Sequence, residues 1–152
     1  MLMMQSNLAT TYHGLGRLEE ANRMLRDVYS GFLKLHGEEH RETLLTASNY
    51  VDSLRTLSRF GEAKSLLRKT LPVARRVLGE DNDGTLMMRL NYAQSLCQDD
   101  DATLDDIREA VAICEDVDRR ARRVLGIAHP LAKDASESLA RARYDLANFK
   151  PK

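Results

Sequence analysis

Apolar residues recur along this chain at steps of three and four positions, which is the spacing of one face of an α-helix. Residues 44–57 carry such an apolar stripe, and after a polar break at residues 58–61 a second stripe runs over residues 63–78. No segment shows the alternation of apolar and polar residues, rich in β-branched side chains, that is typical of a strand. The pattern therefore predicts an all-α chain built from pairs of helices.

The pattern is also repeated. When the sequence is shifted by 42 positions, residues 1–42 align with residues 43–84 and give 11 identical pairs. These pairs are Leu2/Leu44, Ser6/Ser48, Asn7/Asn49, Leu15/Leu57, Arg17/Arg59, Glu20/Glu62, Ala21/Ala63, Leu25/Leu67, Arg26/Arg68, Gly37/Gly79 and Glu38/Glu80. A third copy begins at Thr85 with about five extra residues between Leu96 and Ala110, and a fourth begins near Pro130 and stops after one helix. The sequence therefore predicts units at 1–42, 43–84 and 85–129 and a capping helix at 130–149, in one continuous solenoid domain.

Residues that favour helix ends fall at matching places in the copies. Three equivalent glycines (Gly37, Gly79 and Gly126) are each predicted to end the longer helix of a unit, where a positive φ angle favours glycine. Pro130 is predicted to open the last helix, because proline is tolerated in the first turn. Thr103 and Asp106 have the spacing of a capping box, so a helix is expected to begin after the acidic loop that precedes them.

Residues 7–21 read Asn-Leu-Ala-x-x-Tyr-x-x-x-Gly-x-Leu-x-Glu-Ala, which resembles a tetratricopeptide repeat (TPR). The 42-residue spacing and the junctions at residues 35–40, 77–82 and 124–130 resemble the kinesin-light-chain subtype more closely. This resemblance implies an α-solenoid of antiparallel helix pairs, about three and a half units wound into a right-handed superhelix. It also implies that small residues (Ala9, Ala93 and Ala140) stand where paired helices approach closely. Val51, Ser58 and Arg143 depart from the family pattern.

The resemblance further implies that the first helix of each unit lines a concave groove. An asparagine stands at the equivalent groove position in three units, and its amide, both donor and acceptor, can pair with the backbone of an extended peptide. Hydrogen bonding between helices of the array is the alternative role for these asparagines. The predicted groove residues are Asn7, Asn49, Asn91, Ser6, Thr10, His13, Ser48, Asp52, Arg55, Gln94 and Arg141. The function that follows is non-catalytic binding of a peptide or protein segment, with no cofactor.

A structural role is the alternative. The first helix begins in mid-pattern with Met1, Leu2, Met3 and Met4, whose counterparts in the third copy are expected to pack between units. We therefore expect an apolar N-terminal edge that another copy of the chain, or another protein of a larger assembly, covers. The final helix is polar over much of its surface, as a terminal cap needs to be.

Composition excludes several other classes of function. The 152 residues contain 23 Lys and Arg and 23 Asp and Glu, so the formal net charge is zero, and 5% are aromatic. Binding to nucleic acid or to a membrane surface needs a surplus of basic residues, and no apolar run approaches the length of a membrane span. The chain has two cysteines and no basic signal-peptide start, so we expect the cytoplasm or another reducing compartment.

Two possible chemical sites are weak. His36 and His40 match a H-x-x-E-H zinc pattern, but that chemistry needs both histidines on one helix, and Gly37 is expected to end the helix between them. Cys114 lies on an apolar stripe and is expected in the core, whereas Cys97 is expected to be more exposed but has no His or Asp at a spacing that supports a nucleophile. The sequence predicts neither a metal site nor an enzyme.

Overall fold

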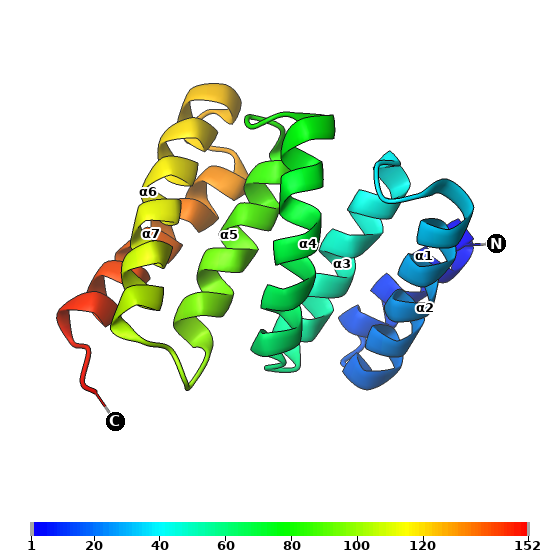
Figure 1. The fold of residues 1–152 in the computed structure, drawn as a ribbon, viewed down its shortest axis with the longest axis horizontal. Helices are drawn as coiled ribbons and strands as arrows, with labels where there is room; N and C mark the ends of the chain where they lie inside the picture. The colour runs from blue at the N-terminus through cyan, green and yellow to red at the C-terminus, as the bar shows by residue number, and fades with distance from the viewer. Residues whose placement is uncertain (1, 152) are drawn as a thin grey trace. The chain divides into compact units, whose positions relative to one another are not determined.

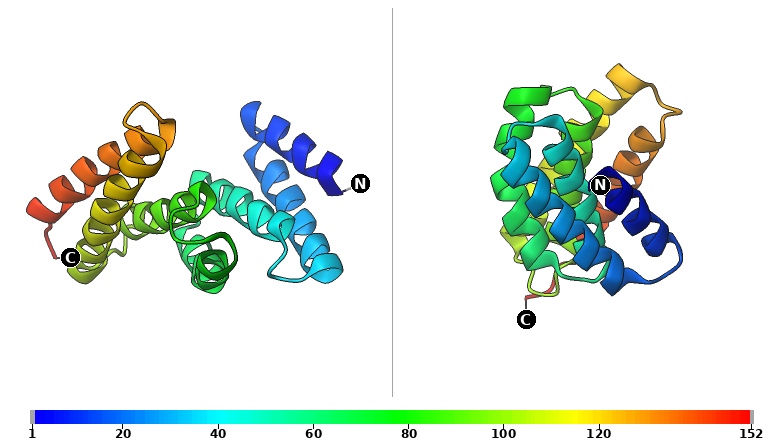
Figure 2. Two further views of the ribbon diagram at one scale, coloured as in Figure 1. Left: turned by 90° about the horizontal axis from the view of Figure 1, so that it is seen from above. Right: turned by 90° about the vertical axis from the view of Figure 1, so that its right-hand side faces the viewer.

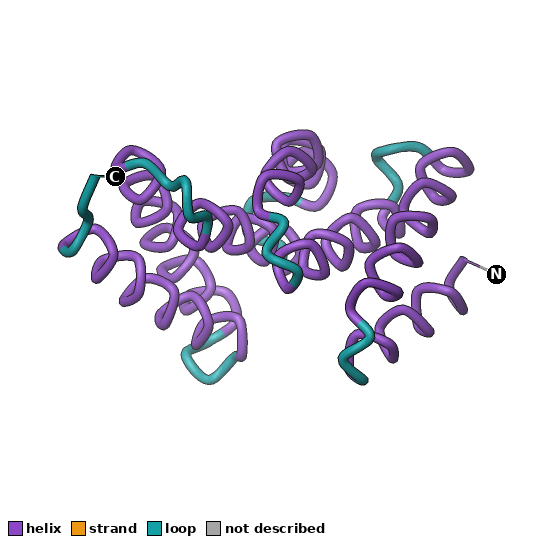
Figure 3. Tube along the Cα trace, turned by 90° about the horizontal axis from the view of Figure 1, so that it is seen from below, coloured by secondary structure: helices purple, strands orange, loops and turns teal. Residues whose placement is uncertain are grey.

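The computed structural model describes residues 2–151, and for residues 6 and 10–13 it gives the backbone without the side chain. Within that range the chain forms helices joined by short loops and no strands, as Figure 3 shows. The helices are α1 (Leu2–Gly14), α2 (Leu18–His36), α3 (Arg41–Thr56), α4 (Phe60–Leu78), α5 (Asp83–Gln98), α6 (Leu104–Leu125) and α7 (Pro130–Ala147). The all-α fold class predicted from the sequence is confirmed.

The helices fall into two compact units, the first ending at Leu78 and the second beginning at Gly79. In the first unit, α1 packs against α2, α2 against α3, and α3 against α4 (Figure 1). In the second unit, α5 packs against α6, α6 against α7, and α7 also contacts α5. Consecutive helices within each unit are therefore neighbours and run antiparallel, as the two further views in Figure 2 show.

The core of the first unit comes from the predicted apolar stripes. Val28 and Phe32 of α2 and Leu44 and Val51 of α3 are all at most 4% exposed. Helix α1 meets α2 very closely at Gly31, where an added Cβ would lie 2.8 Å from a methyl group of Leu2. A glycine inside a helix lowers helix stability, so its presence here is explained by the space that Leu2 occupies.

The core of the second unit joins all three of its helices. Twelve buried residues form one hydrophobic cluster: Leu86, Leu90, Ala93, Leu96, Ala110, Cys114, Val117, Ala121, Leu131, Ala132, Ala135 and Leu139. Cys114 is 1% exposed, which confirms its expected place in the core. Because α7 shares this cluster, the last helix is fixed to the second unit by the same packing that holds α5 and α6 together.

The predicted helix ends are confirmed. Gly37, Gly79 and Gly126 have φ angles of 82°, 95° and 89°, in the region that favours glycine. Thr103 and Asp106 form the predicted capping box, with each side chain accepting a hydrogen bond from the other residue's backbone N–H. Pro130 occupies the first turn of α7. Local sequence therefore sets where these helices begin and end.

Three equivalent helices begin with the same kind of side-chain cap. The Nδ1 atom of His40 accepts a hydrogen bond from the backbone N–H of Glu42 at the start of α3, and His129 does the same for Leu131 at α7. Asn82 caps α5 through its amide oxygen. Each histidine must therefore leave Nδ1 unprotonated to serve as a cap.

The small residues at the helix contacts behave differently in the last helix. Ala9 and Ala93 are buried, as predicted, but Ala140 of α7 is exposed, so its expectation was wrong. Helix α7 instead buries Ala135, Leu139 and Ala142. The face that carries Ala140 has no helix packed on it within residues 2–151, which agrees with the polar character predicted for this helix.

Candidate peptide-binding groove

A cleft of about 780 Å³ lies in the second unit, between α5 and α7. Buried residues from all three helices (Ala93, Ile107, Cys114 and Ala142) form its base. Its rim carries polar and charged side chains from α5, α7 and the segments that follow them. This volume is within the range of pockets that hold small ligands, about 300–1,000 Å³, so the cleft has room for part of an extended peptide.

A side-chain hydrogen-bond bridge crosses the cleft. The Nε2 of Gln94 on α5 donates to the Oγ of Ser138 on α7 at 2.7 Å and to the Oδ1 of Asp134 at 3.3 Å. These bonds use the donor end of the amide. Within the described part of the chain, the Gln94 carbonyl oxygen accepts no hydrogen bond, so it can accept one from a ligand's backbone N–H.

Both cysteines line the cleft, and both are held as neutral thiols. Burial, together with the nearby charge of Asp145, raises the pKa of Cys97 to about 11 against the opposing effect of Arg141. Burial raises the pKa of Cys114 to about 12. A nucleophilic cysteine needs a lowered pKa, so neither thiol is activated at neutral pH.

The charged side chains that line the cleft are mostly acidic. The acidic residues are Asp99, Asp100, Asp134, Glu137 and Asp145, and the basic residues are Arg141 and Lys150. Arg141 is paired with Asp145 through an Nε–Oδ1 contact of 3.4 Å. The cleft is therefore acidic although the whole chain has a formal net charge of zero.

Two of the groove residues predicted from the sequence, Gln94 and Arg141, line this cleft. The third predicted residue of the second unit, Asn91, does not line it and is only 4% exposed. An asparagine this buried supports the alternative that was left open at this position, in which the amide bonds within the array.

The predicted groove residues of the first unit lie on α1 and α3. Asn7 is exposed, whereas Ser48 and Asn49 are half-buried. Asp52 is exposed and accepts a hydrogen bond of 3.4 Å from Arg55 one turn later on the same helix. The side chains of Ser6, Thr10 and His13 lie outside the described residues.

Sequence reasoning missed the end of the cleft. Asp99 and Asp100 come from the α5–α6 loop, and Asn148, Phe149 and Lys150 come from the segment around the end of α7. The acidic run at residues 99–101 was visible in the sequence, but a run of aspartates is usually a solvated loop. Its place beside α7 follows from the packing of α6 and α7, which periodicity alone does not give.

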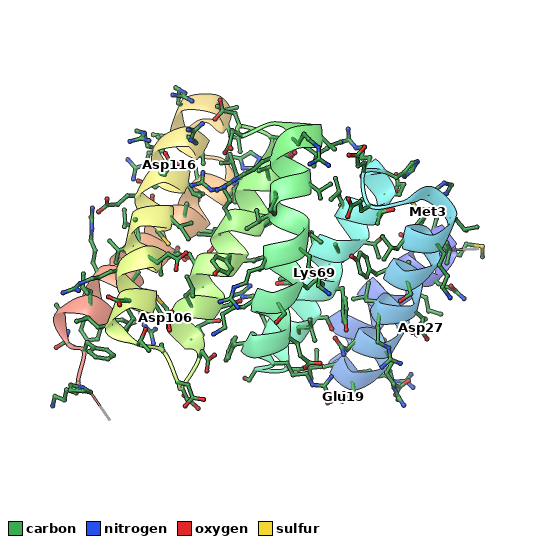
Figure 4. All side chains as sticks on the ribbon, viewed as in Figure 1. Met3, Glu19, Asp27, Lys69, Asp106 and Asp116 are labelled. Carbon is green, nitrogen blue, oxygen red and sulfur yellow. The ribbon has the colours of Figure 1, made fainter. Side chains whose placement is uncertain are left out.

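Ion pairs also connect the elements of the second unit. Arg120 of α6 donates to the Oδ2 of Asp116 at 2.9 Å and to the Oδ1 of Asp81 at 2.8 Å. The hydrogen bond from Arg120 lowers the pKa of Asp81. Asp116 lies further along α6 than Asp106, as the labels in Figure 4 show. The basic run at the end of α6 is therefore engaged in ion pairs within the unit.

The two histidines of the zinc pattern lie at the α2–α3 junction. His36 is the last residue of α2 and His40 caps α3, so the helix ends between them at Gly37, as predicted. Their rings are stacked, with centroids 4.4 Å apart. Among the residues whose side chains are described, no three His, Cys, Asp or Glu gather in an arrangement that could hold a metal ion.

Antiparallel helices that pack in sequence order, with caps and glycines at equivalent positions, define an α-solenoid of helical repeats. The sequence model of the tetratricopeptide repeat family matches residues 1–75. Residues 1–75 therefore belong to the tetratricopeptide-repeat family, and the fold of the described residues is of the kinesin-light-chain-like type. This confirms the family suggested by the sequence.

Solved structures have the same fold. One is the crystal structure of a point variant of a Podosopora anserina protein described as a kinesin light chain with nearly identical TPR-like repeats. Its sequence is 22% identical to this chain, and the two structures superpose with a TM-score of 0.78 over 97% of this chain and 68% of that one. A second crystal structure of that protein, without the substitution, has the same identity and coverage and a TM-score of 0.75. BtubC (BKLC) from P. vanneervenii is 15% identical, with a TM-score of 0.63 over 99% of this chain and 66% of that one. No match was found among curated proteins.

The family sets the broad function. Tetratricopeptide repeats generally act as non-catalytic scaffolds for protein–protein interaction, so protein partners are expected for this chain. None of the helices within residues 2–151 has the length and apolar character that a membrane span requires.

Proposed function

We propose that this chain is a non-catalytic interaction module that holds a peptide or protein segment in a groove lined by the first helix of each repeat. The observation that carries the proposal is the cleft between α5 and α7, because α5 and α7 are first helices of successive repeats. An apolar base with a few hydrogen-bonding groups at its rim is the usual character of a ligand pocket. The carbonyl oxygen of Gln94, which accepts no hydrogen bond from the described residues, supplies one such group.

Selection from a random linear-peptide display library tests this proposal. Recovered peptides are then titrated against variants of two exposed arginines, each of which pairs with an aspartate on its own helix. Arg141→Ala changes the cleft, whereas the matched control Arg108→Ala changes α6 outside it. Binding that changes with Arg141→Ala and with Gln94→Ala, but not with Arg108→Ala, is the expected result. Peptides that bind all four proteins equally would contradict a groove site.

A structural role is a second candidate, favoured by the surface of α1. Met3, Met4 and Leu8 are 50%, 74% and 44% exposed, and together they form an apolar N-terminal edge. In the next repeat the residue equivalent to Met4 is Thr46, which is 2% exposed on the helix that packs against α2. If another copy of the chain or another protein covered this edge, Met4 of α1 would become buried, as the equivalent Thr46 of α3 is.

Oligomeric state tests this second role. Sedimentation of the wild type and of a Met4→Lys variant over a range of protein concentrations separates the two cases. A dimer that Met4→Lys dissociates would support docking by the N-terminal edge. A monomer at every concentration would leave the edge without a second copy on it.

The remaining parts of the proposal concern organisation and location. We propose the repeat boundaries 1–42, 43–84 and 85–129, with the capping helix at 130–149, in one solenoid. The third repeat is longer in two places, the loop at residues 99–103 and helix α6. Helix α6 has 22 residues, whereas the equivalent helix α4 has 19. We also propose protein ligands without nucleic acid, membrane insertion or cofactor, and a reducing compartment such as the cytoplasm, where two free cysteines are stable.

A further inference from the structure

The side chains that line the cleft between α5 and α7 carry an excess of negative charge. Five acidic and two basic residues line it, and Arg141 is already paired with Asp145. Three of the carboxylates (Asp100, Asp134 and Glu137) have no cationic partner within the described residues. In the part of the chain that the structure describes, Asp134 accepts hydrogen bonds only from the neutral side chains of Gln94 and Ser138. The cleft therefore has unneutralised negative charge.

This charge is local. The formal net charge of the chain is zero, and one group of basic residues lies elsewhere, in the second half of α6. There Arg119, Arg120 and Arg123 pair with Asp116 and Asp81. These arginines do not line the cleft. A cationic ligand that enters the cleft can therefore pair with the carboxylates that have no cationic partner among the described residues.

The thiols at the base of the cleft respond to the same negative charge. After burial, the charges of Asp145 and Asp106 raise the pKa of Cys97, and Cys97 followed by the charge of Asp134 raises that of Cys114. Arg141 acts in the opposite direction on Cys97 and does not reverse the shift. A ligand that enters the cleft meets this field above an apolar base formed by Ala93 and Ile107.

Resting on the proposed function, we infer that the cleft between α5 and α7 selects a basic peptide segment. A lysine or arginine of the segment places its aliphatic stem on the apolar base and its charged head near Glu137 and Asp100. Long basic side chains bury their stems in this way while the charge stays near water. A cationic ligand also gains from electrostatic attraction during association, which an acidic ligand would lose.

The test uses the peptides recovered from the random display library and a matched pair of charge reversals. Glu137→Lys reverses a charge in the cleft, and Glu109→Lys reverses an exposed charge on α6 outside it. We expect recovered peptides to be rich in lysine and arginine. Glu137→Lys should weaken their binding by about threefold to tenfold, and Glu109→Lys should leave it unchanged. Raising the salt concentration should weaken binding to the wild type more than binding to Glu137→Lys.

The outcomes separate this inference from the proposed function. Recovered peptides that are neutral or acidic, yet lose binding in Gln94→Ala, would overturn the basic preference and leave the groove as the binding site. Equal weakening by Glu137→Lys and Glu109→Lys would overturn the preference as well, because binding would then depend only on net charge. Peptides that bind every groove variant as well as the wild type would overturn both.

Discussion

Arg89 on α5 donates a hydrogen bond of 2.6 Å from Nη1 to the Oδ2 of Asp116 on α6, and the arginine side chain is 9% exposed. Asp116 also accepts from Arg119 and Arg120 of its own helix. One carboxylate therefore joins α5 to α6 and organises the basic end of α6. Helix α5 forms one wall of the cleft and α6 contributes to its base. Because this ion pair joins the two helices, it helps to fix the geometry of the cleft although neither residue lines it.

Removing the carboxylate should therefore destabilise the protein. Asp116→Ala leaves the buried guanidinium of Arg89 without its counter-charge, and we expect a loss of about 1–3 kcal/mol in the free energy of unfolding. Asp105→Ala is the control, because that side chain is 93% exposed. Urea unfolding followed by circular dichroism measures both. A loss for Asp116→Ala no larger than for Asp105→Ala would contradict a stabilising role.

The same ion pair predicts how stability depends on pH. Burial opposes ionisation of Asp116, but the hydrogen bonds from Arg89 and Arg120 outweigh it and lower its pKa below the ordinary 3.8. A carboxyl group whose pKa is lower in the folded state stabilises the fold above its unfolded pKa, and that contribution is lost as the pH falls through the folded pKa. The free energy of unfolding should fall between about pH 5 and pH 2. Asp116→Asn should show a smaller fall, and an identical fall would assign the effect to other carboxyl groups.

The glycine at the end of α6 should not tolerate a side chain. Gly126 has φ 89° and ψ 157°, a conformation that is essentially restricted to glycine. Gly126→Ala should cost about 1–3 kcal/mol of stability. Gly61 in α4 provides the contrast, because an added Cβ there meets nothing within 4 Å, so Gly61→Ala should raise stability by up to about 1 kcal/mol. Thermal melts of the two variants should shift in opposite directions, and shifts of the same sign would refute this explanation.

The raised pKa of Cys97 predicts slow chemical labelling. With a pKa of about 11, the folded protein holds this residue as a thiol at neutral pH. Alkylation by iodoacetamide at about pH 8 should be at least roughly tenfold slower than for a free cysteine of pKa about 8.5, and it should accelerate as the pH rises. Mass spectrometry of digested protein separates Cys97 from Cys114, and unfolded protein in urea is the control. Equal rates in the folded and unfolded states would contradict the assigned environment.

The sequence predicted the helices well because each depends on local signals. The 42-residue repeat located the helix pairs, and Gly37, Gly126 and the Thr103 capping box located their ends. Even Pro72, in the interior of α4, did not break the apolar stripe of that helix. Such signals lie within a few residues of the end that they set, so one sequence suffices to read them.

The candidate site was predicted only in part, because it depends on packing between helices. Gln94 lies on the cleft wall, whereas Asn91, three residues earlier on the same helix, is buried and does not line the cleft. Whether one face of a first helix is open or covered depends on its neighbours, which periodicity does not specify. For the same reason Ala140 was expected at a close helix contact and is exposed.

The most direct test of the account is where a bound peptide contacts the protein. Backbone amide spectra of isotope-labelled protein, titrated with a basic peptide from the display selection, locate the contacts residue by residue. We predict that shifts gather on the cleft residues of α5 and α7, including Gln94, Ser138 and Arg141, and spare the exposed face of α6 around Glu109. Shifts gathered on the exposed apolar edge of α1, with none at the cleft, would contradict it.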